Sequence, residues 1–166
     1  MEAVELIAGA EQLVAVFGYW PSFHDAELLW LRLDRRAHSD GCYGPTLETL
    51  VHAFEMTSEV DADGYYVLRH HVLVHLRFLD VMELRLDGFN YQNALMGLTL
   101  TDLRDRQMER VRWAVHFNSA FGVDASFQCY AIEVVSVVPC SKAGEAIHAE
   151  PDAAADGRGM SAFPGS

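Results

Sequence analysis

The stretch YWPSFHDAE, residues 19–27, separates two segments of different pattern and decides how the chain folds. Pro21 has no backbone N–H and keeps Trp20 out of helical dihedral angles, so a helix before it must end near Gly18. Three ionisable side chains then follow within four residues: His24, Asp25 and Glu27. The stretch is either a polar latch at a helix-to-strand corner or a functional site, and its residues alone leave both interpretations open.

The segments on either side have clear periodicity. Residues 3–17 carry apolar side chains near helical spacing and acidic side chains elsewhere, which predicts one amphipathic helix. Residues 26–36 alternate, with one fully apolar face, which predicts a strand.

Further strands are predicted from the runs at residues 46–58, 65–79, 81–87, 98–108, 110–119 and 125–138. The Asp-Ala-Asp-Gly sequence at 61–64 predicts a hairpin turn, and 91–96 is expected to be a short helical turn. Within 65–79, His70 is expected on the inward face, and in 98–108 the strand is expected to give way to a loop.

The fold class predicted from this order is α+β. Short loops between strands imply antiparallel pairing, because parallel strands need helical crossovers. We therefore expect an N-terminal helix packed on one face of a mostly antiparallel, strongly curved or barrel-like sheet of six or seven strands. Residues 1–140 are expected to form a single domain, and 141–166, which lack core-forming periodicity, a flexible C-terminal tail.

Composition limits the location of the protein. Half of the residues are apolar (51%), yet no long apolar run is free of charge, so no membrane span is expected. The N-terminus is acidic where a secretory signal is basic. Three cysteines, an odd number without a Cys-x-x-Cys pair, suggest reduced thiols in a cytoplasmic protein.

Net charge is the most informative bulk property. The chain has 24 acidic and 12 basic residues, a net charge of −12, of which residues 141–166 contribute only −2. Such acidity disfavours binding to nucleic acid or to anionic membranes, which requires clustered Lys and Arg. It favours a basic partner, although acidity can also serve solubility alone.

Catalysis and metal binding receive little support from the residue spacing. His24, Asp25 and Glu27 could hold a metal with His71, His75 or His116, as in a metal-dependent hydrolase, but no His-Glu-x-x-His pattern occurs. His71 and His75 lie about 13 Å apart if they share a strand. No nucleophile elbow, phosphate loop or dinucleotide fingerprint occurs either. A non-enzymatic protein without a cofactor is therefore expected, with the hydrolase as an alternative.

The remaining interpretations of the stretch are structural or concern recognition. His24 or Asp25 could cap backbone groups at the corner, as short polar side chains commonly do. Trp20 and Phe23 could belong to the core, or form a recognition face together with the three ionisable residues. The candidate binding residues are Trp20, Phe23, His24, Asp25 and Glu27.

The nine-residue motif, followed by this order of strand patterns over residues 14–138, resembles bacterial immunity proteins of the Imm50 family. The resemblance implies a small cytoplasmic protein that is encoded beside a polymorphic toxin and protects the producing cell by binding the cognate toxin domain. The acidity of the chain fits a basic, nuclease-like toxin domain, and a toxin of another class is an equal alternative. No catalytic residues carry over, and the motif carries over as a signature without assigned roles. A generic ligand-binding or adaptor module is a further alternative, and the oligomeric state is left open.

Overall fold

The computed structural model describes residues 3–37 and 41–147. A 3-10 turn η1 (Ala3–Leu6) precedes the helix α1 (Ala10–Phe17), and a second 3-10 turn η2 (Arg104–Arg106) follows the fifth strand. The strands are β1 (Glu27–Asp34), β2 (Thr46–Val60), β3 (Tyr66–Leu79), β4 (Met82–Asp87), β5 (Ala94–Asp102), β6 (Trp113–Phe121), β7 (Asp124–Cys129) and β8 (Ala131–Pro139). In these ranges no helix is long and apolar enough to cross a membrane.

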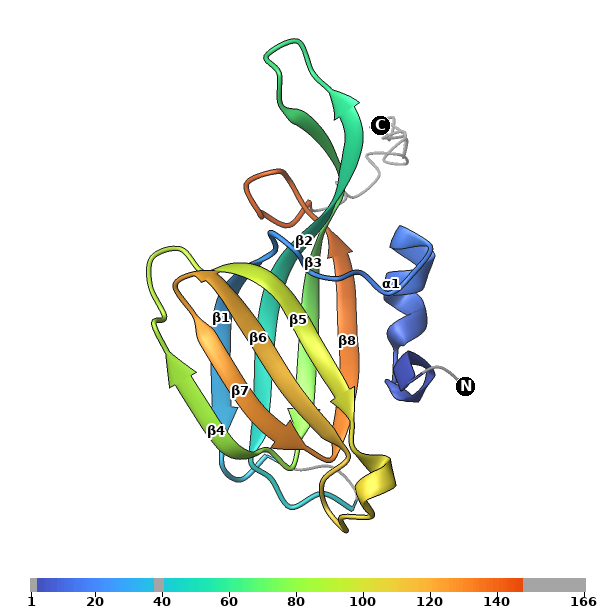
Figure 1. Ribbon diagram of the computed structural model, residues 1–166, viewed down its shortest axis with the longest axis vertical. Coiled ribbons are helices and arrows are strands. Elements are labelled where there is room, and N and C mark those ends of the chain that lie inside the picture. Colours follow the sequence, from blue (N-terminus) through green and yellow to red (C-terminus); the bar gives the residue numbers. More distant parts are fainter. Residues whose placement is uncertain (1–2, 38–40, 148–166) are drawn as a thin grey trace, which may run out of the picture.

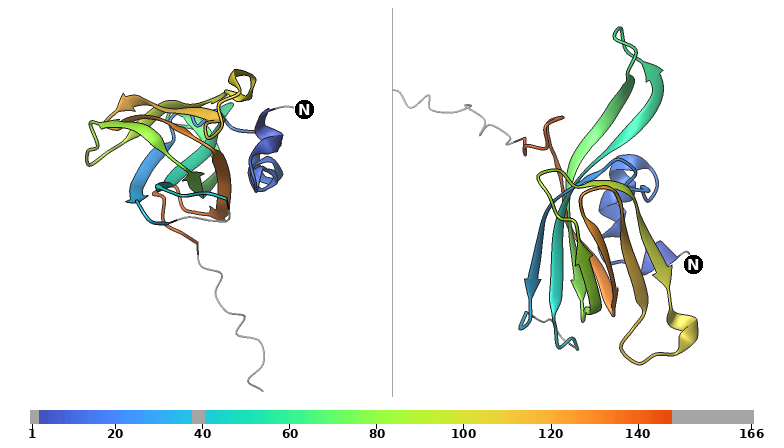
Figure 2. Two further views of the ribbon diagram at one scale, coloured as in Figure 1. Left: turned by 90° about the horizontal axis from the view of Figure 1, so that it is seen from below. Right: turned by 60° about the vertical axis from the view of Figure 1, so that its left-hand side comes forward.

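All eight strands belong to one sheet in the order β4-β7-β6-β5-β1-β2-β3-β8, and all neighbours are antiparallel. The sheet folds back on itself, so that β4, β7, β6 and β5, the front half, cross in front of β1, β2, β3 and β8, the back half (Figures 1 and 2). At the junction between the halves β1 and β5 share a single register pair, Glu27 with Ala94.

The hydrophobic core fills the space between the two halves. Phe78 on β3 in the back half meets Phe117 on β6 and Phe127 on β7 in the front half, with ring centroids 5.9 and 4.9 Å apart. All three rings are almost fully buried. Edge-to-face contacts of this kind stabilise a core beyond the area that they bury.

The prediction of six or seven strands was wrong because residues 125–138 form two strands. At Tyr130 the chain crosses from one half to the other. The Cys129 carbonyl accepts the backbone N–H of Arg112, just before β6 in the front half (3.0 Å). The Tyr130 N–H instead donates to the Leu79 carbonyl in the back half (2.9 Å). The sheet is also not closed, because β4 and β8 form its two edges. The two halves of the sheet meet at the β1–β5 junction, whereas in a closed barrel the first and last strands would also pair.

Two local predictions also need correction. Residues 91–96 form no helical turn, and β5 begins at Ala94. His70 does not face inward, because the register shifts beside it and its backbone adopts φ 56°. Its imidazole instead lies near Glu55 (3.4 Å) and against the ring of Phe17.

The N-terminal helix ends at Gly18, as Pro21 predicts, but it starts later than expected and lies along the edge strand β8 (Figure 1). The helix cannot start before Gly9, because the φ of Gly9 is 78°, outside the helical range. Only glycine fits at this position, because a Cβ there would clash with the Val134 carbonyl. The Gln12 side-chain amide donates to the same carbonyl (3.0 Å). The buried face of the helix, Ala10, Leu13 and Phe17, joins the core.

The strands β2 and β3 extend beyond their neighbours as a two-stranded projection, residues 54–70, which we call the arm (Figure 1). β1 pairs with β2 only over residues 46–52, and β8 pairs with β3 only over 72–79. The predicted turn at 61–64 connects the two strands, and the Asp61 carboxylate accepts the N–H groups of Asp63 (2.9 Å) and Tyr65 (3.0 Å).

The arm is expected to open far more often than the rest of its own two strands. A two-stranded ribbon without further neighbours has marginal stability, and local opening follows from few buried contacts. In hydrogen exchange by mass spectrometry, amides of residues 55–68 should exchange at least about tenfold faster than those of residues 46–52 and 72–78. Equal protection of both regions would contradict this expectation.

Candidate functional site

The motif stretch forms the junction between the two halves of the sheet. Three backbone hydrogen bonds connect it to β5: Asp25 N–H to Leu95 O (2.9 Å), Leu95 N–H to Ala26 O (2.9 Å) and Leu98 N–H to Ser22 O (3.1 Å). Leu28, the residue after the stretch, donates its N–H to Asn93 O (2.9 Å), just before β5. The stretch therefore continues the sheet around the corner from β5 into β1.

The aromatic residues of the motif belong to the framework. Phe23 is 3% exposed and is part of the core. Trp20 is half-buried and packs edge-on against Phe23, with ring centroids 5.9 Å apart. Phe23 and Asp25 both have left-handed backbones, φ 60° and 62°. These conformations allow the chain to turn one aromatic ring inward and the following polar side chains outward.

His24 and Asp25 are exposed and contact each other. The Nδ1 atom of His24 lies 3.1 Å from Asp25 Oδ2, and the two side chains are 55% and 42% exposed. Adjacent residues of an extended strand point to opposite faces, but the left-handed backbone of Asp25 brings this pair together. The backbone capping expected of them is performed by Ser22, whose hydroxyl accepts the His24 N–H (3.2 Å). Glu27 starts β1 opposite His52 on β2.

The histidines of the metal-site alternative are dispersed. His71 pairs with His52 (3.0 Å), His75 lies beside Glu48 (3.6 Å), and His116 lies beside Asp124 (3.0 Å). Over residues 3–37 and 41–147, no three His, Cys, Asp or Glu side chains gather in a metal-binding arrangement. Burial raises the pKa values of the Cys129 and Cys140 thiols, which makes them poor nucleophiles.

A part-buried imidazole pair, His52 with His71, lies at the base of the arm. His52 is 6% exposed and packs against Phe54, while the turn at 141–147 covers it, because a Cβ at Gly144 would lie 3.1 Å from His52 Nδ1. Burial lowers the pKa of His52, with a further contribution from His71, and burial likewise lowers the pKa of His71, with a further contribution from Lys142. The predicted tail 141–166 thus begins with this turn, and residues 148–166 lie outside the described ranges.

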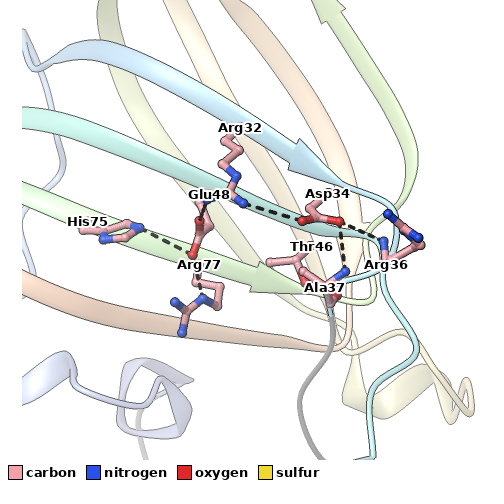
Figure 3. Close-up of polar contacts among 8 residues, drawn as sticks. All are labelled: Arg32, Asp34, Arg36, Ala37, Thr46, Glu48, His75 and Arg77. Atoms are coloured by element: carbon pink, nitrogen blue, oxygen red, sulfur yellow. Dashed lines mark hydrogen bonds and ion pairs between the residues drawn. The ribbon is translucent and has the colours of Figure 1, made fainter.

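An ion network covers part of the outer surface of the back half (Figure 3). Glu48 is its centre, because its carboxylate accepts from Arg77 Nε (2.8 Å) and lies near Arg32 (3.9 Å) and His75 (3.6 Å). The hydrogen bond that Arg77 donates to Glu48 raises the pKa of Arg77. Arg77 also reaches Glu133 (3.3 Å). Each of these charges has a partner within the sheet, so the network stabilises the sheet and offers little uncompensated charge to a ligand.

The arm provides the surface that sequence reasoning missed. Its exposed large hydrophobic residues are Tyr65 (73%), Tyr66 (58%), Val60 (58%) and Met56 (49%). Its charged residues are Glu55, Glu59, Asp61, Asp63 and Arg69, a net charge of −3. The signal was present in the sequence, because the runs at 46–58 and 65–79 are longer than the run at 26–36.

The arm and the motif meet in a shallow hollow at the base of the arm. Its lining comes from the end of α1, the motif and the first arm residues: Phe17, Tyr19, Pro21, Ser22, Phe23, His24, Phe54, Glu55 and Met56. Glu55 connects the parts, because it accepts from the Tyr19 hydroxyl (3.4 Å) and lies near His70. Asp87 and Asp124 face each other in register on β4 and β7, and the Asp124 carboxylate lies near His116 (3.0 Å) and accepts the Ser119 N–H (3.3 Å).

This arrangement favours recognition of another macromolecule over chemistry on a small substrate. The exposed residues of the motif lie next to a projecting acidic ribbon, while its aromatic residues hold the corner. Residues 9–140 match a family model described as Immunity protein 50. Comparisons with curated proteins and with solved structures found no match.

The left-handed backbone at Asp25 predicts a ranking of substitutions. Asp25→Gly should be more stable than Asp25→Ala by about 1 kcal/mol, because a Cβ is strained at this φ and the side chain is well exposed. Urea unfolding of both variants measures the difference. If both variants lose the same large stability, the carboxylate itself supports the corner and the backbone explanation is wrong.

The part-buried pair His52 and His71 predicts a pH dependence. Because both pKa values are lowered in the folded state, the unfolded chain binds more protons once the pH falls below about 6.5. Stability should therefore fall as the pH is lowered from about 7 to about 5.5, by up to about 1.4 kcal/mol per pH unit for each proton. In His52→Gln/His71→Gln this slope, measured by urea unfolding, should be smaller. An unchanged slope would exclude the pair as its source.

Proposed function

The chain belongs to the immunity protein 50 family, and we propose on this basis that it binds and neutralises a cognate bacterial toxin domain. The family match over most of the chain is the observation that carries the proposal. The domain at residues 1–140 acts by occupying a surface of the toxin, without a cofactor and without catalysis. It acts in the cytoplasm, where the toxin would otherwise reach its target.

The partner that fits this surface chemistry is a basic toxin domain, such as a nuclease. The net charge of −12 creates a long-range field that attracts a basic surface. The arm carries Glu55, Glu59, Asp61 and Asp63 against Arg69, a net charge of −3, and Asp25 and Glu27 lie near its base. A nuclease needs a basic surface for phosphate groups, and an acidic inhibitor covering that surface excludes the substrate.

In this proposal the motif residues mainly hold the corner of the sheet and position the base of the arm. Phe23, Trp20 and the backbone bonds to β5 hold the corner, and the corner positions the base of the arm through Tyr19 and Glu55. His24 and Asp25 lie at the edge of the binding surface, where each is accessible to the toxin. Substitution of these two residues therefore affects toxin binding less than substitution of residues that the toxin covers completely.

Association with the toxin domain encoded beside this gene should depend strongly on salt. Long-range attraction acts before contact and is screened beyond about 8 Å at physiological ionic strength, so raising NaCl from about 50 to about 500 mM should slow association by about tenfold or more. Dissociation should change much less. Surface plasmon resonance with the full chain measures both rates.

Two results of this experiment would change the proposal. An association rate independent of salt would mean that the acidity serves solubility and that the interface is apolar. Absence of binding at every salt concentration, together with failure of the co-expressed chain to protect bacteria from the toxin domain, would overturn the toxin-neutralising function. A truncation to residues 1–147 should behave like the full chain, because residues 148–166 carry only −2 of the net charge.

A further inference from the structure

We infer that the arm is the element that contacts the basic surface of the toxin domain. This inference rests on the proposed function and goes further by assigning the interface to residues 54–70. The occupant to which it commits is a basic protein surface, and the groups that recognise it are the tyrosine rings and the carboxylates of the arm.

The arm contributes little to the fold that carries it. Among the described residues, the members of the hydrophobic core stop at Ala53 on β2 and resume at Val72 on β3. Over residues 55–68 the two strands pair only with each other in the described structure. A projecting ribbon of this length with no role in the core is costly to keep ordered, so a role in binding explains its presence better than a role in stability.

The side chains of the arm have the composition of an interface centre. Tyr65 and Tyr66 are 73% and 58% exposed, and Val60 lies opposite Tyr66 in the register. Tyrosine is enriched in interfaces because it buries a large rigid ring and keeps a polar end. Met56, opposite Leu68, adds a flexible apolar contact.

The charge of the arm selects the partner. Asp61 is engaged in the turn and Glu59 pairs with Arg69, but the carboxylate of Asp63 is at the exposed tip. The net charge of −3 on 17 residues complements a basic surface and repels nucleic acid. The network around Glu48 is less suitable, because its charges already compensate one another.

The test compares two full-length variants with the same change in composition. The arm variant is Asp63→Lys with Tyr65→Ser, and the control is Asp105→Lys with Tyr43→Ser. Tyr43 and Tyr65 are equally exposed (73% each), both aspartates are exposed, and both variants have the same net charge. The control residues lie at the opposite end of the molecule (Figure 1). The backbone N–H of Tyr43 donates to the Asp80 carboxylate (2.7 Å), just beyond the end of β3, and Asp105 lies in η2.

Binding to the toxin domain encoded beside this gene is measured for both variants and for the unaltered chain. We expect the arm variant to bind at least about tenfold more weakly, because removal of an interface tyrosine and reversal of a charge act together. The control should bind within about threefold of the unaltered chain. Thermal unfolding of all three proteins verifies that each is folded.

The outcomes separate the inference from the proposed function. If the unaltered chain binds and both variants bind equally well, or equally poorly, the arm is not the contact and only the inference fails. If the unaltered chain does not bind, both fail. A second measurement needs no variant: toxin binding should slow hydrogen exchange at residues 55–68, and unchanged exchange there would overturn the inference even if the arm variant proved unstable.

Discussion

The backbone bonds between the motif stretch and β5 are the constraint on which the rest of the structure depends. They are the place where an antiparallel sheet turns back and faces itself, and the core forms only because the two halves face each other. Asn93 reinforces this corner, since its buried side chain accepts from the Asn90 (2.8 Å) and Val123 (3.1 Å) N–H groups while its carbonyl accepts from Leu28. A buried polar group with all of these partners costs little, whereas loss of any partner leaves an unpaired group inside the protein.

In β2 and β3, one portion of each strand stabilises the core and the other portion is available for recognition. The lower portions of β2 and β3 contribute Val51, Val74 and Phe78 to the core, while their extensions carry exposed tyrosines and carboxylates. This division permits the exposed surface to change without loss of the fold, because the extensions make few core contacts. It also places a net charge of −3 on the arm, where electrostatic attraction can orient a partner before contact.

Local sequence rules succeeded where the cause was local. Pro21 predicted the end of α1 at Gly18, and the Asp-Ala-Asp-Gly turn at 61–64 was found where its left-handed glycine requires it. They failed where a strand changes its neighbours in the sheet, as at Tyr130. The apolar pattern continues without a break through Tyr130, although the chain leaves one half of the sheet for the other at this residue. Of the candidate site, sequence indicated the importance of residues 19–27 and missed the arm as a surface.

What the sequence by itself determined is the family, the sign of the charge, the end of the helix near Gly18 and the turn at 61–64, because each depends on residue type or on a few adjacent residues. Only the tertiary structure decided that Phe23 enters the core while His24 and Asp25 remain exposed, since this depends on two left-handed residues held by bonds to β5. It likewise decided that β2 and β3 project as an arm. The length of a strand is encoded locally, but whether it is covered depends on where its neighbours β1 and β8 end.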